Sequence, residues 1–387
     1  MSTAQQRRAY AGPALFSYGF RPFFLSGAIW SALSVPLWIW SLMGGPAIAG
    51  HRDWHIHEML FGVLPAIVAG FLTTAVPNWT GRMPVIGGKL ALLWSLWLAG
   101  RIAMLAEAFI GPVAVWIDAA FTIVFALVIW REVLAGKNWR NLPICLLTSL
   151  LAGANIAFHL DAVLDLQGLG WRLALAAATG MLALIGGRIT PSFTTNWLRQ
   201  RNITPLPTPF NTLDKVAVVG AAAAALVWTL FPDQVAVGLL LLAAGGVNLA
   251  RLSRWQGRRT TPEPLLSILH VSYAWLALGM ALLGASVLTP FVPLAAGVHA
   301  LSAGAIGVTC LAVMCRATRG HTGRALTADK ATMGIFAAIN LAAVLRVVAP
   351  FAPEFQAGLL ILAALCWSLA YGGYAVAYWA MLTRPRK

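Results

Sequence analysis

Two histidines occupy equivalent positions in a chain that repeats itself. His57 begins the stretch HEMLFGVLPAIVAGFLTTAVPNWTGR, and His299 begins HALSAGAIGVTCLAVMCRATRGHTGR, 242 residues later. Aligned without a gap, the two stretches share the histidine, a glycine five residues further on and a closing Thr-Gly-Arg. Neutral imidazole nitrogen is a common ligand of haem iron, so two such histidines on neighbouring helices would form an axial pair. We therefore expect His57 and His299 to bind haem.

A third, weaker copy of this stretch lies between the other two. It runs from Leu175 to Gln200, at an offset of 118 residues from the first copy, and has leucine where the others have histidine. Repeats of this length fix the architecture of a chain. We expect one integral-membrane domain built from three internal repeats, at about residues 1–135, 136–258 and 259–387.

The composition places these repeats in a membrane. Hydrophobic residues make up 59% of the chain and charged residues only 10%, which is too little polar surface for a soluble protein of 387 residues. A helix needs roughly 20 apolar residues to span a bilayer, and the chain has twelve such runs separated by glycine and proline. The sequence therefore predicts an all-α, polytopic membrane protein of about 12 transmembrane helices in three pseudo-symmetric four-helix arcs.

The basic residues predict the orientation. With both termini in the cytoplasm, 23 of the 27 lysines and arginines fall on the inner side, as the positive-inside rule requires. The net charge of +15 is spread over many short inner segments, so it indicates topology and not a nucleic-acid surface. We expect a multi-pass protein of an inner-type (cytoplasmic) membrane, with the lipid bilayer as its partner and no nucleic acid.

Arginines on the predicted outer side could complete a haem site. A b-type haem carries two propionates, which need cationic or hydrogen-bonding partners at the edge of the bilayer. Arg52, Arg172 and Arg346 are the candidates, although ordinary interfacial positions would explain each of them equally well.

A second group of candidate residues lies on the predicted inner side. His270 and His321, together with Arg188, Arg316 and Arg324, could hold a second haem or an anion. The alternative is a positively charged inner loop that happens to contain a histidine. We expect His159 to be only a hydrogen-bonding partner of a neighbouring helix.

The run His55-Ile56-His57-Glu58 has a further possible use. Residues two apart do not share a helix face, so His55 and His57 would not address the same haem within one helix. If the helix instead began at His57, His55 could bind copper, for which imidazole is a suitable ligand. Hydrogen bonding at the start of the helix is the alternative.

Several long motifs resemble the NnrS family of bacterial inner-membrane proteins. They are FSYGFRPFF (16–24), HIHEMLFG (55–62), GFLTTAVPNWTG (70–81), RITPSFTTN (188–196), LHVSYAW (269–275) and the stretch that begins at His299. The resemblance implies a polytopic protein that binds haem b, at one or two sites, and copper. It also implies a role in nitric-oxide metabolism, either in denitrification or in defence against nitrosative stress.

The predicted architecture also resembles the catalytic subunits of haem-copper oxidases and nitric-oxide reductases. In those subunits, histidines of helices 2 and 10 hold the low-spin haem, a role that His57 and His299 would carry here. Gly297 stands where a second histidine of helix 10 would be, and Leu175 marks a helix 6 without histidine. The usual binuclear centre is therefore missing, which argues against oxygen reduction.

These observations favour a haem-binding inner-membrane protein that binds or detoxifies nitric oxide and receives electrons from an unknown donor. No catalytic residue is identified. One alternative is an atypical nitric-oxide reductase that produces nitrous oxide. Another is a 12-helix transporter of a metal, haem or nitrosylated iron, although a threefold repeat and few buried charges such as Asp118 count against it.

Overall fold

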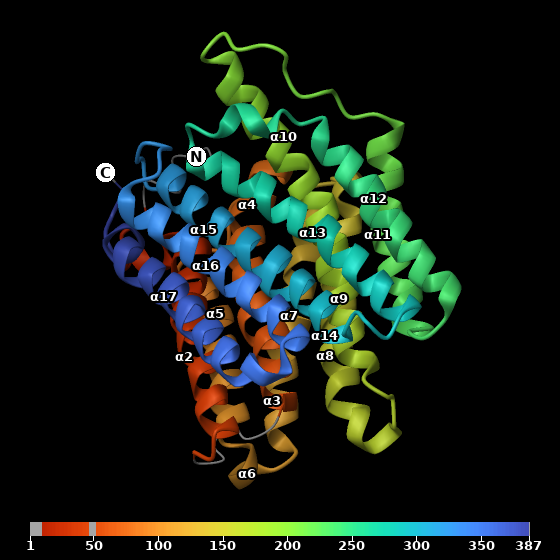
Figure 1. Ribbon diagram of the computed structural model, residues 1–387. Helices are drawn as coiled ribbons and strands as arrows, with labels where there is room; N and C mark the ends of the chain where they lie inside the picture. Colours follow the sequence, from red (N-terminus) through yellow and green to blue (C-terminus); the bar gives the residue numbers. More distant parts are fainter. Residues whose placement is uncertain (1–9, 46–51, 387) are drawn as a thin grey trace. The chain divides into compact units, whose positions relative to one another are not determined.

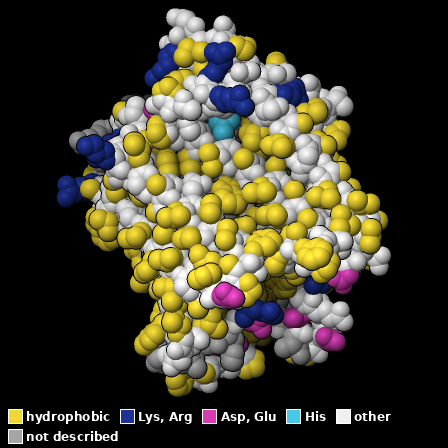
Figure 2. All heavy atoms as spheres, in the orientation of Figure 1, with side chains coloured by type: hydrophobic (Ala, Val, Ile, Leu, Met, Phe, Trp, Pro, Cys, Tyr) yellow, Lys and Arg dark blue, Asp and Glu magenta, His cyan; other side chains and the backbone are white. Residues whose placement is uncertain are grey.

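The computed structural model describes residues 10–45 and 52–386, without the side chain at position 162, and in these residues it consists of helices joined by turns and loops (Figure 1). Among the described residues, twelve helices are long and apolar enough to span a membrane, in agreement with the twelve runs predicted from the sequence. The spans are Phe20–Leu42, Arg52–Thr80, Gly88–Leu105, Val113–Ala135, Trp139–Asp161, Leu169–Arg199, Thr212–Leu230, Val235–Ser253, Pro264–Leu288, Leu294–His321, Lys330–Phe351 and Pro353–Thr383. On the face drawn in Figure 2, hydrophobic side chains cover much of the surface, as lipid contact requires.

The chain forms two compact units. The first comprises residues 1–174, 314–325 and 371–387, and the second comprises residues 175–313 and 326–370. This division is not the division into three sequence repeats, which stays a prediction, as does the cytoplasmic position of both termini.

The first unit is built mainly from the first five spans. Its helices are α2 (Phe20–Leu42), α3 (Arg52–His57), α4 (Leu64–Thr80), α5 (Gly88–Leu105), α6 (Glu107–Ile110), α7 (Val113–Ala135) and α8 (Leu142–Leu164). Within it, α2 packs on α4, α5 packs on α7, and α7 also contacts α4 and α8. Glycine and proline mark the ends of helices here. Helix α4 stops at Gly81, whose φ of 69° is left-handed, and α7 starts directly after Pro112.

The second unit is built mainly from the middle spans and α16. Its helices are most of α9 (Leu169–Met181), α10 (Gly187–Arg199), α11 (Thr212–Leu230), α12 (Val235–Ser253), α13 (Pro264–Leu288), α14 (Leu294–His299), the start of α15 (Val308–His321), α16 (Lys330–Val348) and the larger part of α17 (Gln356–Thr383). Here α13 packs closely on α12 and α14, and α14 contacts α16. The start of α11 carries a capping box, in which Asn211 and Asp214 bond each other's backbone N–H groups.

Three spans contain a wide π-helical turn, and they are the three spans that carry the repeated stretch. The turns are η3 (Glu58–Val63), η5 (Leu182–Gly186) and η7 (Ala300–Gly307), and the repeat offset of 242 residues places the first of them within the third. A π-turn leaves backbone carbonyls without their usual helical partners. In η3, the indole Nε1 of Trp97 donates to the carbonyl of Gly62 at 2.8 Å.

A buried arginine donates hydrogen bonds to backbone carbonyls at the π-turn of the second unit. Arg251 is fully buried and donates to the carbonyls of Ala183 (2.9 Å) and Gly187 (3.3 Å). Its Nε donates to Asp214 Oδ1 at 2.9 Å, and its Nη1 also donates to the hydroxyl of Tyr273 at 2.7 Å. One guanidinium thus joins α12 to α11, α13 and the π-turn.

We expect Arg251→Gln to lower the stability of the protein strongly. The substitution leaves the buried carboxylate of Asp214 with only its longer ion-pair contact, to Arg254 Nη1 at 3.4 Å. Breaking a buried ion pair costs about 3–5 kcal/mol in proteins generally. Thermal unfolding in detergent would measure the effect, with the exposed Arg258→Gln as the matched control. Adding Asp214→Asn to Arg251→Gln should recover part of the loss; an unchanged melting temperature in the single variant would contradict the role assigned to Arg251.

Candidate functional site

Four charged or ionisable side chains meet in the interior of the first unit. His57, Glu58, Arg101 and Asp118 lie inside membrane-spanning helices, and none of them is more than 2% exposed. Charged side chains at this depth are unfavourable unless they are paired, and where they occur they are generally functional. This group, the buried charge centre, is therefore our candidate functional site.

Arg101 of α5 joins the two carboxylates of the centre. Its Nη1 donates to Glu58 Oε2 at 2.6 Å, and its Nη2 donates to Asp118 Oδ1. The planar fork of a guanidinium suits such double pairing, which a lysine would not reproduce. Two glycines give the groups room: a Cβ on Gly62 would lie 2.5 Å from Arg101 Nη1, and one on Gly100 would lie 3.2 Å from Asp118 Oδ1.

His57 lies between the same two carboxylates. Its Nδ1 is 3.1 Å from Glu58 Oε1, and its Nε2 is 3.0 Å from Asp118 Oδ2. Ionised carboxylates only accept hydrogen bonds, so an imidazole that bonds both must donate from both nitrogens and carry a positive charge. With Arg101 also positive, the centre then holds two positive and two negative charges. Such neutrality lowers the cost of burying it.

Neighbouring spans complete the hydrogen bonding. On α8, Asn155 and His159 are four residues apart, so they share a helix face. Asn155 Nδ2 donates to Asp118 Oδ2 at 2.9 Å, and His159 Nε2 lies 3.1 Å from the same oxygen. From α2, the indole of Trp30 donates to Glu58 Oε2 at 2.5 Å. Five spans of the first unit thus contribute to one network.

His299, the repeat counterpart of His57, lies at the end of α14 in the second unit. It is half-buried, and its Nδ1 bonds the carbonyl of Ala295 at 2.7 Å. Because a carbonyl can only accept, the proton is on Nδ1, and Nε2 of a neutral ring carries the lone pair that a metal needs. Since His57 and His299 belong to different units, their pairing around one haem stays a prediction.

Arg346 is the predicted outer arginine in the same unit as His299. It lies in the last turn of α16, half-buried, and makes no hydrogen bond or ion pair within residues 10–45 and 52–386. Its neighbour Val347 packs against Ala296 and Ala300, on either side of His299 in sequence. The packing of α14 and α16 therefore brings the turn that holds Arg346 next to the segment that holds His299.

The other predicted outer residues have different surroundings. The α3 helix starts at Arg52, not at His57, so His55 is a helical residue; its ring stacks on Trp38 with centroids 4.1 Å apart. The side chain of Arg52 is 82% exposed, and its Nε lies 3.7 Å from Asp53 Oδ1. Arg172 donates to the carbonyl of Gln167 at 2.8 Å. The structure does not bring these three residues into the buried charge centre.

The predicted inner residues are divided between the two units. In the second unit, which also contains Arg188, the buried His270 bonds Thr194 Oγ1 through its Nε2 at 2.9 Å. In the first unit, His321 lies against the rings of Tyr18 and Phe20, with centroids 6.0 and 5.5 Å away. Each histidine thus has its own local contacts, and a shared haem or anion site stays a prediction.

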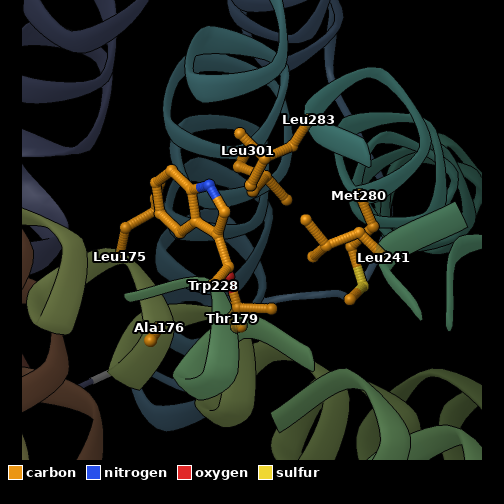
Figure 3. Close-up of a pocket in the computed structure, with 9 residues that line it drawn as sticks. Leu175, Ala176, Thr179, Trp228, Leu241, Met280, Leu283 and Leu301 are labelled. Atoms are coloured by element: carbon orange, nitrogen blue, oxygen red, sulfur yellow. The ribbon is translucent and has the colours of Figure 1, made fainter. Parts of the chain in front are cut away.

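Leu175, which replaces the repeated histidine in the middle repeat, has a largely apolar environment in which Thr179 is the polar side chain. It lines a pocket together with Trp228, Leu241, Met280 and Leu301, whose side chains converge from different helices (Figure 3). The pocket leaves no room for a water molecule. The position that carries histidine in the other two repeats therefore serves hydrophobic packing here.

Sequence reasoning missed the partners of His57. In the sequence, Arg101 is only one of the four basic residues outside the predicted inner segments, and Asp118 is one of a few buried charges. The expected bond of His159 to a neighbouring helix is confirmed, and its partner is Asp118. The available signal was that Arg101 and Asp118 each interrupt an apolar run of a chain that is only 10% charged. Charges at membrane depth need partners of opposite sign, which would have suggested the pair.

We expect Gly62→Ala to destabilise the protein. The new methyl group would lie 2.5 Å from Arg101 Nη1 and 2.6 Å from Glu58 Oε2, so the ion pair would have to move. Gly153→Ala is the matched control, because a Cβ at that helical glycine meets nothing within 4 Å. Melting temperatures in detergent should fall for the first variant and not for the second; equal melting temperatures would show that the centre tolerates the displacement.

Comparison with known proteins gives one finding and one negative result. The family described as "NnrS protein" matches residues 14–386, nearly the whole chain. No curated relative matches the sequence.

Proposed function

This chain belongs to the NnrS family of membrane proteins, which is linked to the response to nitric oxide, and we propose a function on that basis. We propose that the protein binds nitric oxide at a haem. In this proposal it is a bacterial inner-membrane protein that holds haem b, with copper as a further cofactor, and receives electrons from a donor still to be identified. The twelve spans suit such a role, because nitric oxide is small and apolar and enters a bilayer readily.

The observation that supports the proposal most directly is the hydrogen bond of the His299 ring. Its Nδ1 donates to a backbone carbonyl, an arrangement that fixes ring orientation and keeps the lone pair on Nε2. Metal-binding histidines commonly have this second hydrogen bond. The small residues around it, Ala296, Gly297 and Ala300, are buried and let neighbouring helices pack closely against this segment.

Arg346 would serve the haem propionates. It is a half-buried guanidinium without a hydrogen-bonding partner among the described residues, on the turn of α16 that packs against α14. Guanidinium groups bind carboxylates in a planar, two-point manner. In this role Arg346 would hold the cofactor in place and compensate its negative charge.

His57 is the less suitable haem ligand of the predicted pair. Its Nε2 is bonded to Asp118 and its Nδ1 to Glu58, so binding iron would require it to give up a bond inside a neutral ion-pair network. Haem iron supplies the position at which nitric oxide binds, and that position stays open when the protein contributes one axial histidine. We therefore assign the haem to His299 alone.

Optical spectra of the purified protein would test this function first. We expect a haem b spectrum in the wild type that changes when nitric oxide is added, and loss of haem in His299→Ala. His55→Ala is the matched control, because His55 stacks on Trp38 in the other unit and should not affect haem content. A wild-type protein without haem would overturn the proposal and favour the transporter alternative.

Haem retention would test Arg346. Arg346→Ala removes charge-assisted hydrogen bonds to a propionate, each of which contributes about 1.5–3 kcal/mol, so haem should transfer to apomyoglobin roughly ten to a hundred times faster. Lys330→Ala removes one positive charge from the opposite end of the same helix and should leave the rate unchanged. Equal rates in the two variants would mean that Arg346 does not hold the haem.

Catalytic turnover is a separate question from binding. Repeated consumption of nitric oxide with release of nitrous oxide would indicate a reductase. A single spectral change without gas turnover would indicate a binding protein, which is the outcome we expect.

A further inference from the structure

We propose that Trp275 of α13 is a positioning residue for the ligand histidine His299. Its indole is held by Asn340 of α16 and supports the π-turn η7, which starts directly after His299, so that the imidazole keeps one direction. The inference rests on the proposed function and adds to it the residues that orient the ligand. All of them belong to the second unit.

Trp275 lies along the segment that contains His299. Its side chain packs on the cluster that includes Ala296 and Ala300, and a Cβ added to Gly304 would lie 2.6 Å from its ring. Ala296, Ala300 and Gly304 follow one another at intervals of four residues, so they share one face of the helical segment. His299 comes directly before Ala300 and therefore lies on the neighbouring face.

Asn340 sets the orientation of the indole. Nε1 of Trp275 donates to Asn340 Oδ1 at 3.1 Å, and Asn340 Nδ2 donates to the carbonyl of Phe336, one turn earlier in α16, at 2.8 Å. The second bond uses the amide nitrogen and leaves the amide oxygen for the indole. Helix α16 also packs on α14 and η7, and so does α13. The pair of side chains therefore connects the helices that surround His299.

The first repeat supports its π-turn in another way. Gly62 and Gly304 are equivalent positions of the repeated stretch, and both lie in π-turns. The space beside Gly62 is occupied by Arg101 and Glu58, whereas the space beside Gly304 is occupied by the indole of Trp275. An uncharged support suits a histidine that binds iron, because a carboxylate beside an imidazole favours a proton on the nitrogen that should bind the metal.

The support affects His299 through the π-turn. The bond from His299 Nδ1 to the carbonyl of Ala295 orients the ring relative to its own helix. The direction of that helix end depends on η7, and a π-turn is a rare distortion that contacts with neighbouring side chains maintain. Loss of the indole support would give η7 more freedom, and with it the histidine at its start.

Resonance Raman spectroscopy of the reduced, haem-loaded protein would test this role, because the iron–imidazole stretching vibration reports the orientation of the ligand. Trp275→Phe keeps an aromatic ring beside Gly304 but cannot donate to Asn340, and Asn340→Leu removes the acceptor. We expect both variants to bind haem in the wild-type amount and to show the same shift or broadening of this band. Since the two residues act as a pair, the double variant should show no further change.

Gly304→Ala tests the same contact from the other side. Its methyl group would lie 2.6 Å from the indole and should displace it, with a similar change of the band. Gly334→Ala is the matched control, because a Cβ at that glycine of α16 meets nothing within 4 Å. Trp94→Phe is the control for the lost hydrogen bond, since its Nε1 donates to Ser26 Oγ at 3.0 Å in the first unit. Both controls should keep the wild-type band.

Hydrogen exchange of the haem-free protein gives a second readout. The backbone amides of Ala300–Gly307 should exchange faster in Trp275→Phe than in Trp94→Phe. Asn340→Leu tests the role even if Trp275→Phe does not fold. A wild-type band in both variants, or unchanged exchange, would overturn the positioning role and leave the haem assignment intact. Wild-type protein without haem would instead contradict the proposed function, and this role with it.

Discussion

The pairing of Arg101 with Glu58 and Asp118 is the interaction on which the first unit depends. A single one of these charges would be strongly unfavourable inside a bilayer, and each carboxylate becomes acceptable because Arg101 and His57 both lie within hydrogen-bonding distance of it. The ion pairs also place requirements on the residues around them. Gly62 and Gly100 must lack side chains so that the groups can approach, Trp97 must satisfy the carbonyl that the π-turn leaves open, and Asn155 and His159 must face Asp118.

The second unit also contains a buried arginine that is paired with a carboxylate at a π-helical turn. Arg251 pairs with Asp214 and donates to two carbonyls at the π-turn of the sixth span, and Gly187 gives its guanidinium space, since a Cβ there would lie 2.4 Å from it. In both units, therefore, a wide helical turn, a glycine and a buried arginine occur together. The consequences differ. Arg251 has backbone carbonyls, the hydroxyl of Tyr273 and a single carboxylate as partners. Arg101 pairs with two carboxylates, which also bond His57 and His159.

The distribution of histidines gives the two units different chemical capacities. His57 belongs to a neutral, hydrogen-bonded network and has a second imidazole, His159, next to it. His299 bonds a backbone carbonyl and lies in a segment of small apolar residues beside the turn of Arg346. Leu175, at the same position of the middle repeat, contributes only to hydrophobic packing. One repeated sequence stretch thus supports three different environments, because the residues that surround it come from other helices.

The sequence by itself determined the membrane class, the twelve spans and the family, because hydrophobic length and contiguous motifs are properties of neighbouring residues. It also pointed to His57 and His299, since an internal repeat can be recognised without knowledge of the fold. It did not reveal that Arg101, Asp118, Asn155 and His159 surround His57: these residues are separated from it by 44 to 102 positions and lie on three other helices. Nor did it show that His55 and His57 have different partners, which follows from a helix that begins at Arg52. Only tertiary packing decides which charges of distant spans meet, because each pair forms through helix contacts that no local sequence pattern specifies.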